Sequence, residues 1–287
     1  MNNCDRKKYS EDDGKRNADE FQQGFDASLW YPVFHVPHDG NEFPEELLKS
    51  ICIPMENFKA CHEKMRDKDV SILIPPSYQT NNRVYAFSVS RLLCDVERFI
   101  GPEEVMEQYG MGFCYEKAFD GTVIKRVTEE LRRKTRKYYE DHHSRINRLC
   151  EQHRRILFID MHSYSKEIIP ADFLRAEQTL PELCIGVDKS ITPPRLVRAA
   201  VHSFQEAGLS VAINYPYSGC YVPESIMNGK AACDFAGIML EFQRNAYMNE
   251  KNERIRENVE RIRNAIQNIL HTVIRDGSLC TAKPLKR

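Results

Sequence analysis

The segment RILFIDMHS, at residues 155–163, decides the fold that we expect for this chain. Its first part is apolar at successive positions, and a short strand without polar positions is typically buried on both faces of a sheet. Asp160 and His162 close the strand and, two residues apart in an extended segment, project to the same side. We therefore expect a buried strand with two chemically useful side chains at its carboxyl end.

Segments of two kinds lie around this strand. Apolar runs of strand length occur at 29–38, 70–75, 83–90, 209–216 and 236–243. Helical spacing of apolar residues occurs at 45–65, 124–154, 193–207 and 250–273, and the Pro-Pro pair at the start of the third stretch suits a first helical turn. Short apolar strands that alternate with amphipathic helices indicate a mainly parallel sheet covered on both faces.

In a sheet of this kind, ligands bind just beyond the carboxyl ends of the strands. The polar side chains at or near those ends are His38, Asp160, His162, Asn214 and Glu241. The sequence thus brings its candidate chemistry to the place where the fold would put a site.

Composition and charge exclude several classes of protein. Apolar residues make up 41% of the 287 residues and charged residues 29%, which is a globular rather than a disordered balance. The net charge of −1 gives no general attraction to nucleic acid or anionic lipid. No run approaches the roughly 18 apolar residues of a membrane span, and the start of the chain lacks the apolar core of a secretory signal. We expect a cytoplasmic protein with a flexible lead-in at 1–20 and a single domain at 21–287.

The ten cysteines form no CxxC pair, so the paired thiolates of a structural zinc site are missing from the sequence. Cys94 and Cys184 lie inside apolar runs and are expected to pack as small buried apolar residues. Reduced, structural cysteines also agree with the rarity of disulfides in the cytosol.

His38 is the first candidate metal ligand. In the segment HVPHDGNEFP it stands between an apolar strand and a Gly-containing turn, a junction that can hold an imidazole rigidly. A loop histidine without a metal role is the alternative on this segment alone. His35 competes as the ligand, but it lies within the strand rather than at its end.

Asp160 and His162 give the stronger signal. A carboxylate on the same side of the strand as His162 can orient that imidazole or charge the site from outside the ligand set. A solvated Asp160 beside a core His162 with satisfied hydrogen bonds is the alternative. His142 and His143 point about 100° apart on a helix and cannot both bind one metal ion, so we expect packing or surface roles for them.

Glu241 interrupts the apolar run GIMLEFQ. A carboxylate is costly to bury unless it is paired or functional, and desolvation would raise its pKa toward the range of a general base. A structural ion pair with Arg244 is the alternative. Arg91, Arg98 and Arg244 are the arginines in apolar or strand-like surroundings, and a guanidinium suits a substrate carboxylate.

Other chemistries find less support. The sequence has no GxGxxG, GxxxxGK[ST] or GxSxG motif, so nucleotide binding and a serine-hydrolase elbow are not indicated. The basic stretch LRRKTRKYY at 131–139 has acidic residues on both sides, and we expect a solvated helix face there rather than a nucleic-acid site.

Seven segments, in order, resemble the N-formylglutamate amidohydrolase family and cover roughly residues 30–270. They read FHVPHDGNEFP, FSVSRLLCDVERF, YGMGFCYEKAFDGTVI, ILFIDMHSYS, CIGVDKSITPP, GLSVAINYPYSGCYVP and MLEFQRNAYM. The resemblance implies a three-layer α/β/α sandwich, similar to those of phosphorylases and zinc carboxypeptidases, with a central mixed, mainly parallel sheet. It also implies a metal-dependent enzyme that cleaves an amide to release glutamate or a related amino acid.

By this resemblance, His38 matches the histidine of a PH-x-G motif and His162 that of a D-x-HS motif, and both would bind one zinc ion. A catalytic zinc site with two histidines needs a third, acidic ligand. Asp67 in MRDKD is the best match in order, although Lys68 stands where the family usually has a histidine. Glu42, four residues after His38, is the alternative third ligand.

The resemblance assigns further roles. Glu241 would be the catalytic glutamate, and Arg98 in DVERF would bind a substrate carboxylate. Asn214, Tyr217 and Tyr221 would line the substrate loop.

We therefore expect zinc-dependent hydrolysis of an N-acyl amino acid, with N-formyl-L-glutamate, which yields formate and L-glutamate in amino-acid catabolism, as the first candidate. Zinc would lower the pKa of a water, and Glu241 would move its proton to the leaving amine. A related metallo-amidase or carboxypeptidase that acts on another amide is one alternative. A degenerate member that binds an amino acid without turnover is the other, and Lys68 keeps it open.

Overall fold

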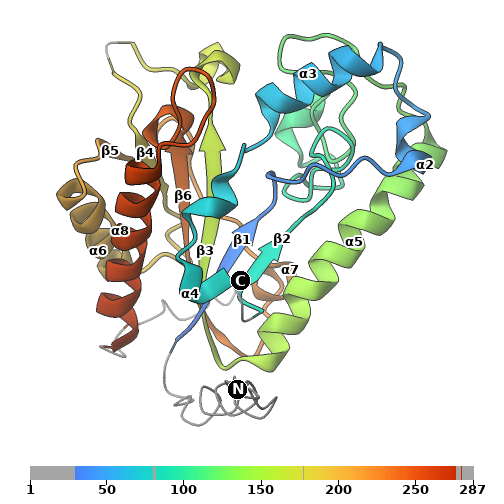
Figure 1. Ribbon diagram of the computed structural model, residues 1–287. Helices are drawn as coiled ribbons and strands as arrows, with labels where there is room; N and C mark the ends of the chain where they lie inside the picture. Colours follow the sequence, from blue (N-terminus) through green and yellow to red (C-terminus); the bar gives the residue numbers. More distant parts are fainter. Residues whose placement is uncertain (1–29, 80–81, 177, 276–278, 280–287) are drawn as a thin grey trace, which may run out of the picture.

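In the computed structural model, which describes residues 30–79, 82–176, 178–275 and 279, a six-stranded sheet runs through the molecule in the order β2-β1-β3-β6-β4-β5 (Figure 1). The strands are β1 (Tyr31–Val36), β2 (Val84–Ala86), β3 (Arg155–Tyr164), β4 (Leu183–Gly186), β5 (Val211–Ile213) and β6 (Asp234–Gln243). β1, β2, β3 and β6 are parallel, whereas β4 is antiparallel to β6 and parallel to β5. The expected mixed, mainly parallel sheet is confirmed, and the predicted lead-in at 1–20 lies outside the described residues.

Helices cover both faces of the sheet (Figure 1). On one face, Ile159 and Ile238 share a core with buried residues of α6 (Pro194–Glu206) and α8 (Arg256–Arg275). On the other face, Phe158 packs with Ile146 and Leu149 of α5 (Glu129–Gln152). Because β3 and β6 are apolar at successive positions, each supplies side chains to both cores, as a centrally placed parallel strand must.

The long helix α5 follows from its sequence signals. Thr128 caps its first turn by accepting a hydrogen bond from the backbone N–H of Leu131, and two glutamates follow the cap, where negative charge is favourable. Its buried residues Leu131, Thr135, His142, Ile146 and Leu149 recur at helical spacing. The helix therefore presents one continuous face inward, and His142 lies on that face.

The remaining elements are short. The helices are α2 (Glu45–Leu48), α3 (Met55–Met65), α4 (Pro76–Gln79) and α7 (Glu224–Met227), and the 3₁₀ segments are Val70–Leu73, Val105–Tyr109, Lys166–Ile168, Ala171–Phe173 and Arg244–Ala246. α2, α3 and the irregular chain from 87 to 127 form a separate cluster around Leu47, Phe58 and Leu93, beside the first half of α5 (Figure 1). This cluster faces the carboxyl end of β1.

The prediction of a strand at 70–75 is wrong, because Val70–Leu73 form the 3₁₀ helix η1. The Asp39 carboxylate accepts hydrogen bonds from the backbone N–H groups of Asp69 and Ser71 and from the Ser71 hydroxyl. These local bonds take the place of strand pairing. The apolar pattern arises because Val70 and Leu73 are buried in the core beneath α8.

Two further expectations need correction. No strand was predicted at the position of β4. This strand is antiparallel to β6, and β5, which is parallel to β4, therefore also runs opposite to β6. Asn214 therefore follows a strand that runs opposite to β1, β3 and β6, and the end of that strand is level with Leu240 of β6. The helix predicted at 45–65 is two helices, since residues 49–54, which end in Pro54, separate α2 from α3.

No helix within the described ranges is long and apolar enough to cross a membrane. The eight cysteines that fall within these ranges are free thiols, and Cys94 and Cys184 are buried as expected.

Candidate active site

The carboxyl ends of three parallel strands bring four of the predicted residues together. The chain leaving β1 carries His38, β3 carries Asp160 and His162, and β6 carries Glu241. His162 and Glu241 are paired in register on adjacent strands. All four side chains are buried, with 1–7% of their surface exposed.

Asp67 reaches the same place from the loop after α3. Its Oδ2 atom lies 3.0 Å from His162 Nδ1 and 3.7 Å from His38 Nδ1, and it accepts a hydrogen bond from the backbone N–H of Ser163 at 3.1 Å. The Asp67 backbone N–H donates to the His38 carbonyl at 3.0 Å, which ties the two loops together. The predicted trio of His38, Asp67 and His162 is thus assembled from three distant parts of the chain.

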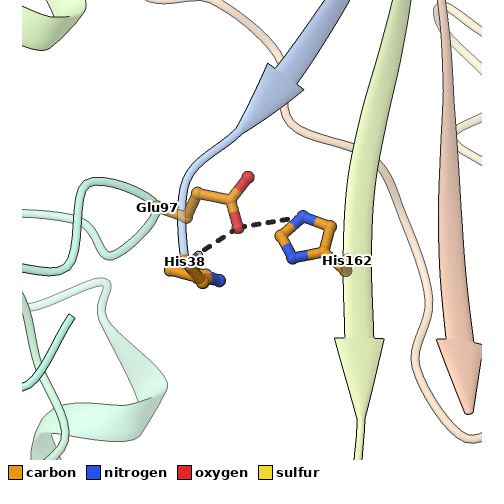
Figure 2. Close-up of side chains that lie close together, drawn as sticks. All are labelled: His38, Glu97 and His162. Carbon is orange, nitrogen blue, oxygen red and sulfur yellow. Dashed lines mark ion pairs between the residues drawn. The ribbon is translucent and has the colours of Figure 1, made fainter. Parts of the chain in front are cut away.

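Glu97 also faces these histidines, and sequence reasoning missed it. Its Oε2 atom is 3.3 Å from His162 Nε2 and 3.7 Å from His38 Nε2 (Figure 2). One ligand atom from each of His38, Glu97 and His162 lies within 4.8 Å of the other two, so this trio could also hold a metal ion. The available signal was the glutamate of DVERF, but only the neighbouring Arg98 received a role there.

A buried ion pair stands behind His38. Its Nε2 atom donates to Asp95 Oδ1 at 2.8 Å, and the other Asp95 oxygen accepts from Arg91 at 2.9 Å and from the Tyr115 hydroxyl at 3.0 Å. Arg91 also contacts Asp67 at 3.4 Å. Arg91, one of three arginines considered for a substrate carboxylate, therefore has two protein carboxylates as partners.

The charges around the two imidazoles stabilise a positive charge at this point. Burial by itself lowers the pKa of His162, but the Glu97 and Asp160 carboxylates outweigh burial and raise it well above its usual value. Burial and Arg91 oppose a charge on His38 in the same way, and Asp95 and Asp67 outweigh them to raise its pKa. A field that favours a proton on both rings also favours a metal cation in place of that proton.

The carboxylates themselves remain ionised. Burial would raise the pKa of Asp67, but its hydrogen bond with His162 and the nearby His38 dominate and lower it. Asp95 and Asp160 follow the same balance, with His38 and His162 as their first compensating partners, and their pKa values fall well below the usual range. These groups therefore act as hydrogen-bond acceptors or as metal ligands.

Glu241 differs from these acids. Burial raises its pKa to about 8, and His162, the strongest opposing group, only partly offsets the effect. Arg244, the alternative partner, donates instead to the backbone carbonyls of Glu63, Lys64 and Arg66. Glu241 is thus a buried carboxyl with a pKa near the working range of a general base.

The donor set suits a divalent metal ion. The Nδ1 atom of His38 is buried and has no hydrogen-bond partner within the described residues, and it faces Asp67 Oδ2. With metal bonds of about 2.0–2.1 Å, two ligand atoms of a tetrahedral zinc site lie roughly 3.3–3.5 Å apart. The separations of 3.0 and 3.7 Å from Asp67 to the two Nδ1 atoms bracket that value, whereas the group of three ligand atoms that lie within 4.8 Å of one another and include both histidines contains Glu97 rather than Asp67.

The predicted substrate residues lie in different surroundings. Arg98 approaches Asp95 at 3.9 Å and keeps 25% of its side chain exposed. Asn214, with a φ of 53°, accepts from the Val187 backbone N–H at 2.8 Å and donates to the Val187 carbonyl at 3.3 Å, so its amide joins two loops.

Both tyrosines border the site through their loop. The Tyr221 backbone N–H donates to Asp160 Oδ2 at 3.0 Å, and its hydroxyl pairs with His143 Nδ1 at 2.9 Å. The Tyr217 ring packs edge-on against Tyr164, which directly follows Ser163 on β3. The loop predicted to line the substrate thus lies against β3, while its tyrosines already have protein partners.

Glu42, the alternative third ligand, and Lys68, which stands where the family usually has a histidine, both have partners away from the two histidines. Glu42 is exposed and accepts a hydrogen bond from the Ser88 hydroxyl at 2.8 Å. Lys68 pairs with Glu63 at 3.2 Å. Asp67 and Glu97, rather than Glu42, are therefore the acids that face both histidines.

Comparisons with known proteins bear on the fold and on the family of the chain. The N-formylglutamate amidohydrolase from Ralstonia eutropha JMP134 is similar in structure with a TM-score of 0.68 and 20% identity, over 87% of this chain and 95% of that one. The gene product Atu2144 from Agrobacterium tumefaciens gives a TM-score of 0.52 and 16% identity over 88% and 92%. These identities show the fold alone, and no curated protein matches in sequence. The family model described as N-formylglutamate amidohydrolase, however, matches residues 32–248, and the chain therefore belongs to the N-formylglutamate amidohydrolase family.

Proposed function

We propose that this protein is a zinc-dependent amidohydrolase that hydrolyses the amide bond of an N-acyl amino acid, with N-formyl-L-glutamate as the first candidate. Membership of the family supports amidohydrolase activity. The observation that carries the proposal is the convergence of His38 and His162 with two acids, Asp67 facing their Nδ1 atoms and Glu97 facing their Nε2 atoms.

The hydrogen bonds of the two histidines support Nδ1 as the metal-binding atom. His38 Nε2 lies 2.8 Å from Asp95, and His162 Nε2 lies 3.1 Å from Asp160. Because both carboxylates are ionised, they accept, and each ring keeps a proton on Nε2. In the metal-free protein His162 Nδ1 also donates to Asp67 at 3.0 Å, and a metal ion would take the place of the Nδ1 proton, as in the carboxylate–histidine–metal arrangement of many zinc sites. Asp67, on the Nδ1 side of the rings, is the third ligand that we propose, and Glu97, on the Nε2 side and within 4.8 Å of a ligand atom of each histidine, is the alternative.

Each remaining residue has a distinct task. A zinc ion at this centre would supply Lewis acidity, which polarises a carbonyl and lowers the pKa of water. Glu241 would take the proton of the attacking water and deliver it to the nitrogen of the leaving amine. Arg98 would bind a carboxylate of the substrate and so orient the amide. The surrounding burial would exclude bulk water and strengthen each charge interaction.

Chelation tests the metal requirement. Purified protein should hydrolyse N-formyl-L-glutamate, lose the activity with chelator and regain it with zinc. Equal rates with and without chelator would contradict the proposal. A panel of formyl, acetyl and succinyl amino acids would then define the acyl group and the amino acid.

A matched pair of variants tests the third ligand. Asp67→Asn should weaken zinc binding by about 100-fold, because a ligand loses its charge, whereas Glu97→Gln should change it by less than about tenfold. Zinc affinity would be measured by competition with a chromogenic chelator. The reverse order would transfer the ligand role to Glu97.

A further inference from the structure

A chain of hydrogen bonds runs from α5 through β1 to the candidate metal centre. His142 Nε2 lies 2.9 Å from His35 Nε2, and His35 Nδ1 lies 2.9 Å from Asp160 Oδ1. The same Asp160 oxygen lies 3.1 Å from His162 Nε2. The four side chains are buried, with 0–5% of their surface exposed, and the proposed mechanism gives no task to His35 or His142.

The direction of each hydrogen bond follows from the ionised Asp160. This carboxylate only accepts, and its donors are His35 Nδ1, His162 Nε2 and the backbone N–H of Tyr221. His35, whose Nδ1 donates to Asp160, can then accept at Nε2 from His142. Burial, followed by the nearby His35, lowers the pKa of His142 well below its usual value, which favours the neutral form of that ring.

The inner end of the chain agrees with this assignment. If His142 carries its only proton on Nε2, its Nδ1 atom is unprotonated and can only accept a hydrogen bond. That atom is buried and has no hydrogen-bond partner among the residues that the structure describes. An unpaired acceptor is tolerated more readily there than an unpaired N–H group. The opposite direction of the chain would place an unpaired N–H at this position.

We propose that His35 and His142 are positioning residues that hold Asp160 against His162 Nε2, so that the ring is oriented with Nδ1, which donates to Asp67 in the metal-free protein, toward the place that a metal ion would occupy. The inference rests on the proposed metal centre. His35 supplies the donor that shares an Asp160 oxygen with His162, and His142 fixes the tautomer of His35. The register places His35 beside Asp160 on adjacent parallel strands, so the backbone aligns the two groups.

A second metal ion is the competing explanation for the same residues. His35, Glu97 and Asp160 form another group whose ligand atoms lie within 4.8 Å of one another. The lone pairs of Asp160 already face three donors, and His35 Nδ1 is closer to Asp160, at 2.9 Å, than to Glu97, at 3.5 Å. A metal ion at His35 Nδ1 would also move the His35 proton to Nε2, which would then donate to His142 Nε2. The proton of His142 would have to lie on Nδ1, where it has no partner among the described residues. The observations therefore favour hydrogen bonding.

Paired substitutions separate positioning from packing. Gln can donate from a position close to that of the imidazole Nε2, and Asn from a position close to Nδ1, whereas Leu fills space without donating. His142→Gln and His35→Asn should keep zinc affinity within about threefold of the unmodified protein. His142→Leu should weaken it about tenfold, and His35→Leu, which removes the direct donor, up to about 100-fold. Thr135→Val, at another buried position of α5, is the control for helix packing and should leave zinc affinity unchanged.

The readouts are the zinc dissociation constant, the number of zinc ions per chain and the tautomer of His162 from nitrogen NMR of histidine-labelled protein. The zinc-loaded protein should show one zinc ion and a protonated Nε2 on His162, and the Leu variants should show a second tautomer. Unchanged affinity and tautomer in folded His35→Leu would overturn the proposal while leaving the metal centre intact. Two ions per chain, one of them lost in His35→Asn, would replace it with a second metal site. A chain that binds no zinc at all would overturn both this proposal and the proposed function.

Discussion

His162 and Glu241 occupy paired positions on the adjacent parallel strands β3 and β6, so the candidate metal ligand and the candidate base are set side by side by the sheet itself. Their relative position does not depend on a loop. A base held in this way keeps its distance from the metal ligand even when the surrounding loops move.

Glu241→Gln tests the base. The substitution keeps the size of the side chain but removes proton transfer, so we expect kcat to fall by about 10²–10⁴-fold, with KM little changed. Zinc content should stay near that of the unmodified protein, since Glu241 is not among the proposed ligands. A variant with near-normal kcat would remove Glu241 from the mechanism.

Arg98→Gln tests recognition of the substrate. Removing the guanidinium should lower kcat/KM for N-formyl-L-glutamate by about 10–100-fold, mainly through KM, because a charged hydrogen-bonding partner is lost. The measurement is repeated with the α-amide and the γ-amide of the same compound. The amide that lacks the carboxylate bound by Arg98 should be affected least. An equal loss for all three compounds would show that Arg98 binds neither carboxylate.

Arg91→Met tests the buried ion pair. Arg91 contacts Asp95 at 2.9 Å and Asp67 at 3.4 Å, and its side chain is only 12% exposed. Without it both carboxylates lose a buried counter-charge, and we expect the free energy of unfolding to fall by about 3–5 kcal/mol. Urea denaturation with chelator present measures the effect in the absence of zinc.

Lys134→Met is the matched control for that substitution. Lys134 pairs with Glu130 at 2.6 Å on the exposed side of α5. An exposed helical pair of this kind contributes little to stability, because water and salt screen its charges. Equal losses in the two variants would mean that the buried arginine is no more important than a surface pair.

His62 gives the fold a defined pH dependence. Burial, assisted by Arg66, lowers its pKa from 6.5 to about 4, and the ring bonds to Ser90 and Asn41. Between pH 4 and 6.5 the unfolded chain binds a proton that the folded chain excludes, so stability from this group falls as the pH is lowered, by about 3 kcal/mol at most.

Urea denaturation at several pH values measures this dependence. His62→Gln should flatten the slope of stability between pH 4 and 6.5. His202→Gln, which alters a histidine with 74% of its side chain exposed, should leave the slope unchanged. A slope that is the same in His62→Gln and in the unmodified protein would contradict the prediction.

The sequence predicted the central part of the fold because local patterns were sufficient there. The apolar residues of β1, β3 and β6 require burial on two faces, whichever strands lie beside them. The polar residues that end these strands, His38 and His162 among them, therefore had to meet at one edge of a parallel sheet. Wherever local hydrogen bonds competed, as in η1 beneath Asp39, the same apolar pattern misled the prediction.

The sequence by itself determined that His162, Asp160 and Glu241 lie toward the ends of buried strands, since the burial of each strand can be recognised from its own residues. Only the tertiary structure decided which acids meet the histidines. Asp67 and Glu97 come from irregular segments whose course is set by loop hydrogen bonds and by the packing of α3 against the cluster around Leu93. The direction of β4, and with it the position of Asn214, was likewise decided by pairing with β6, which lies far away in the sequence. Strand burial is a local property, whereas the meeting of two loops depends on contacts between distant residues.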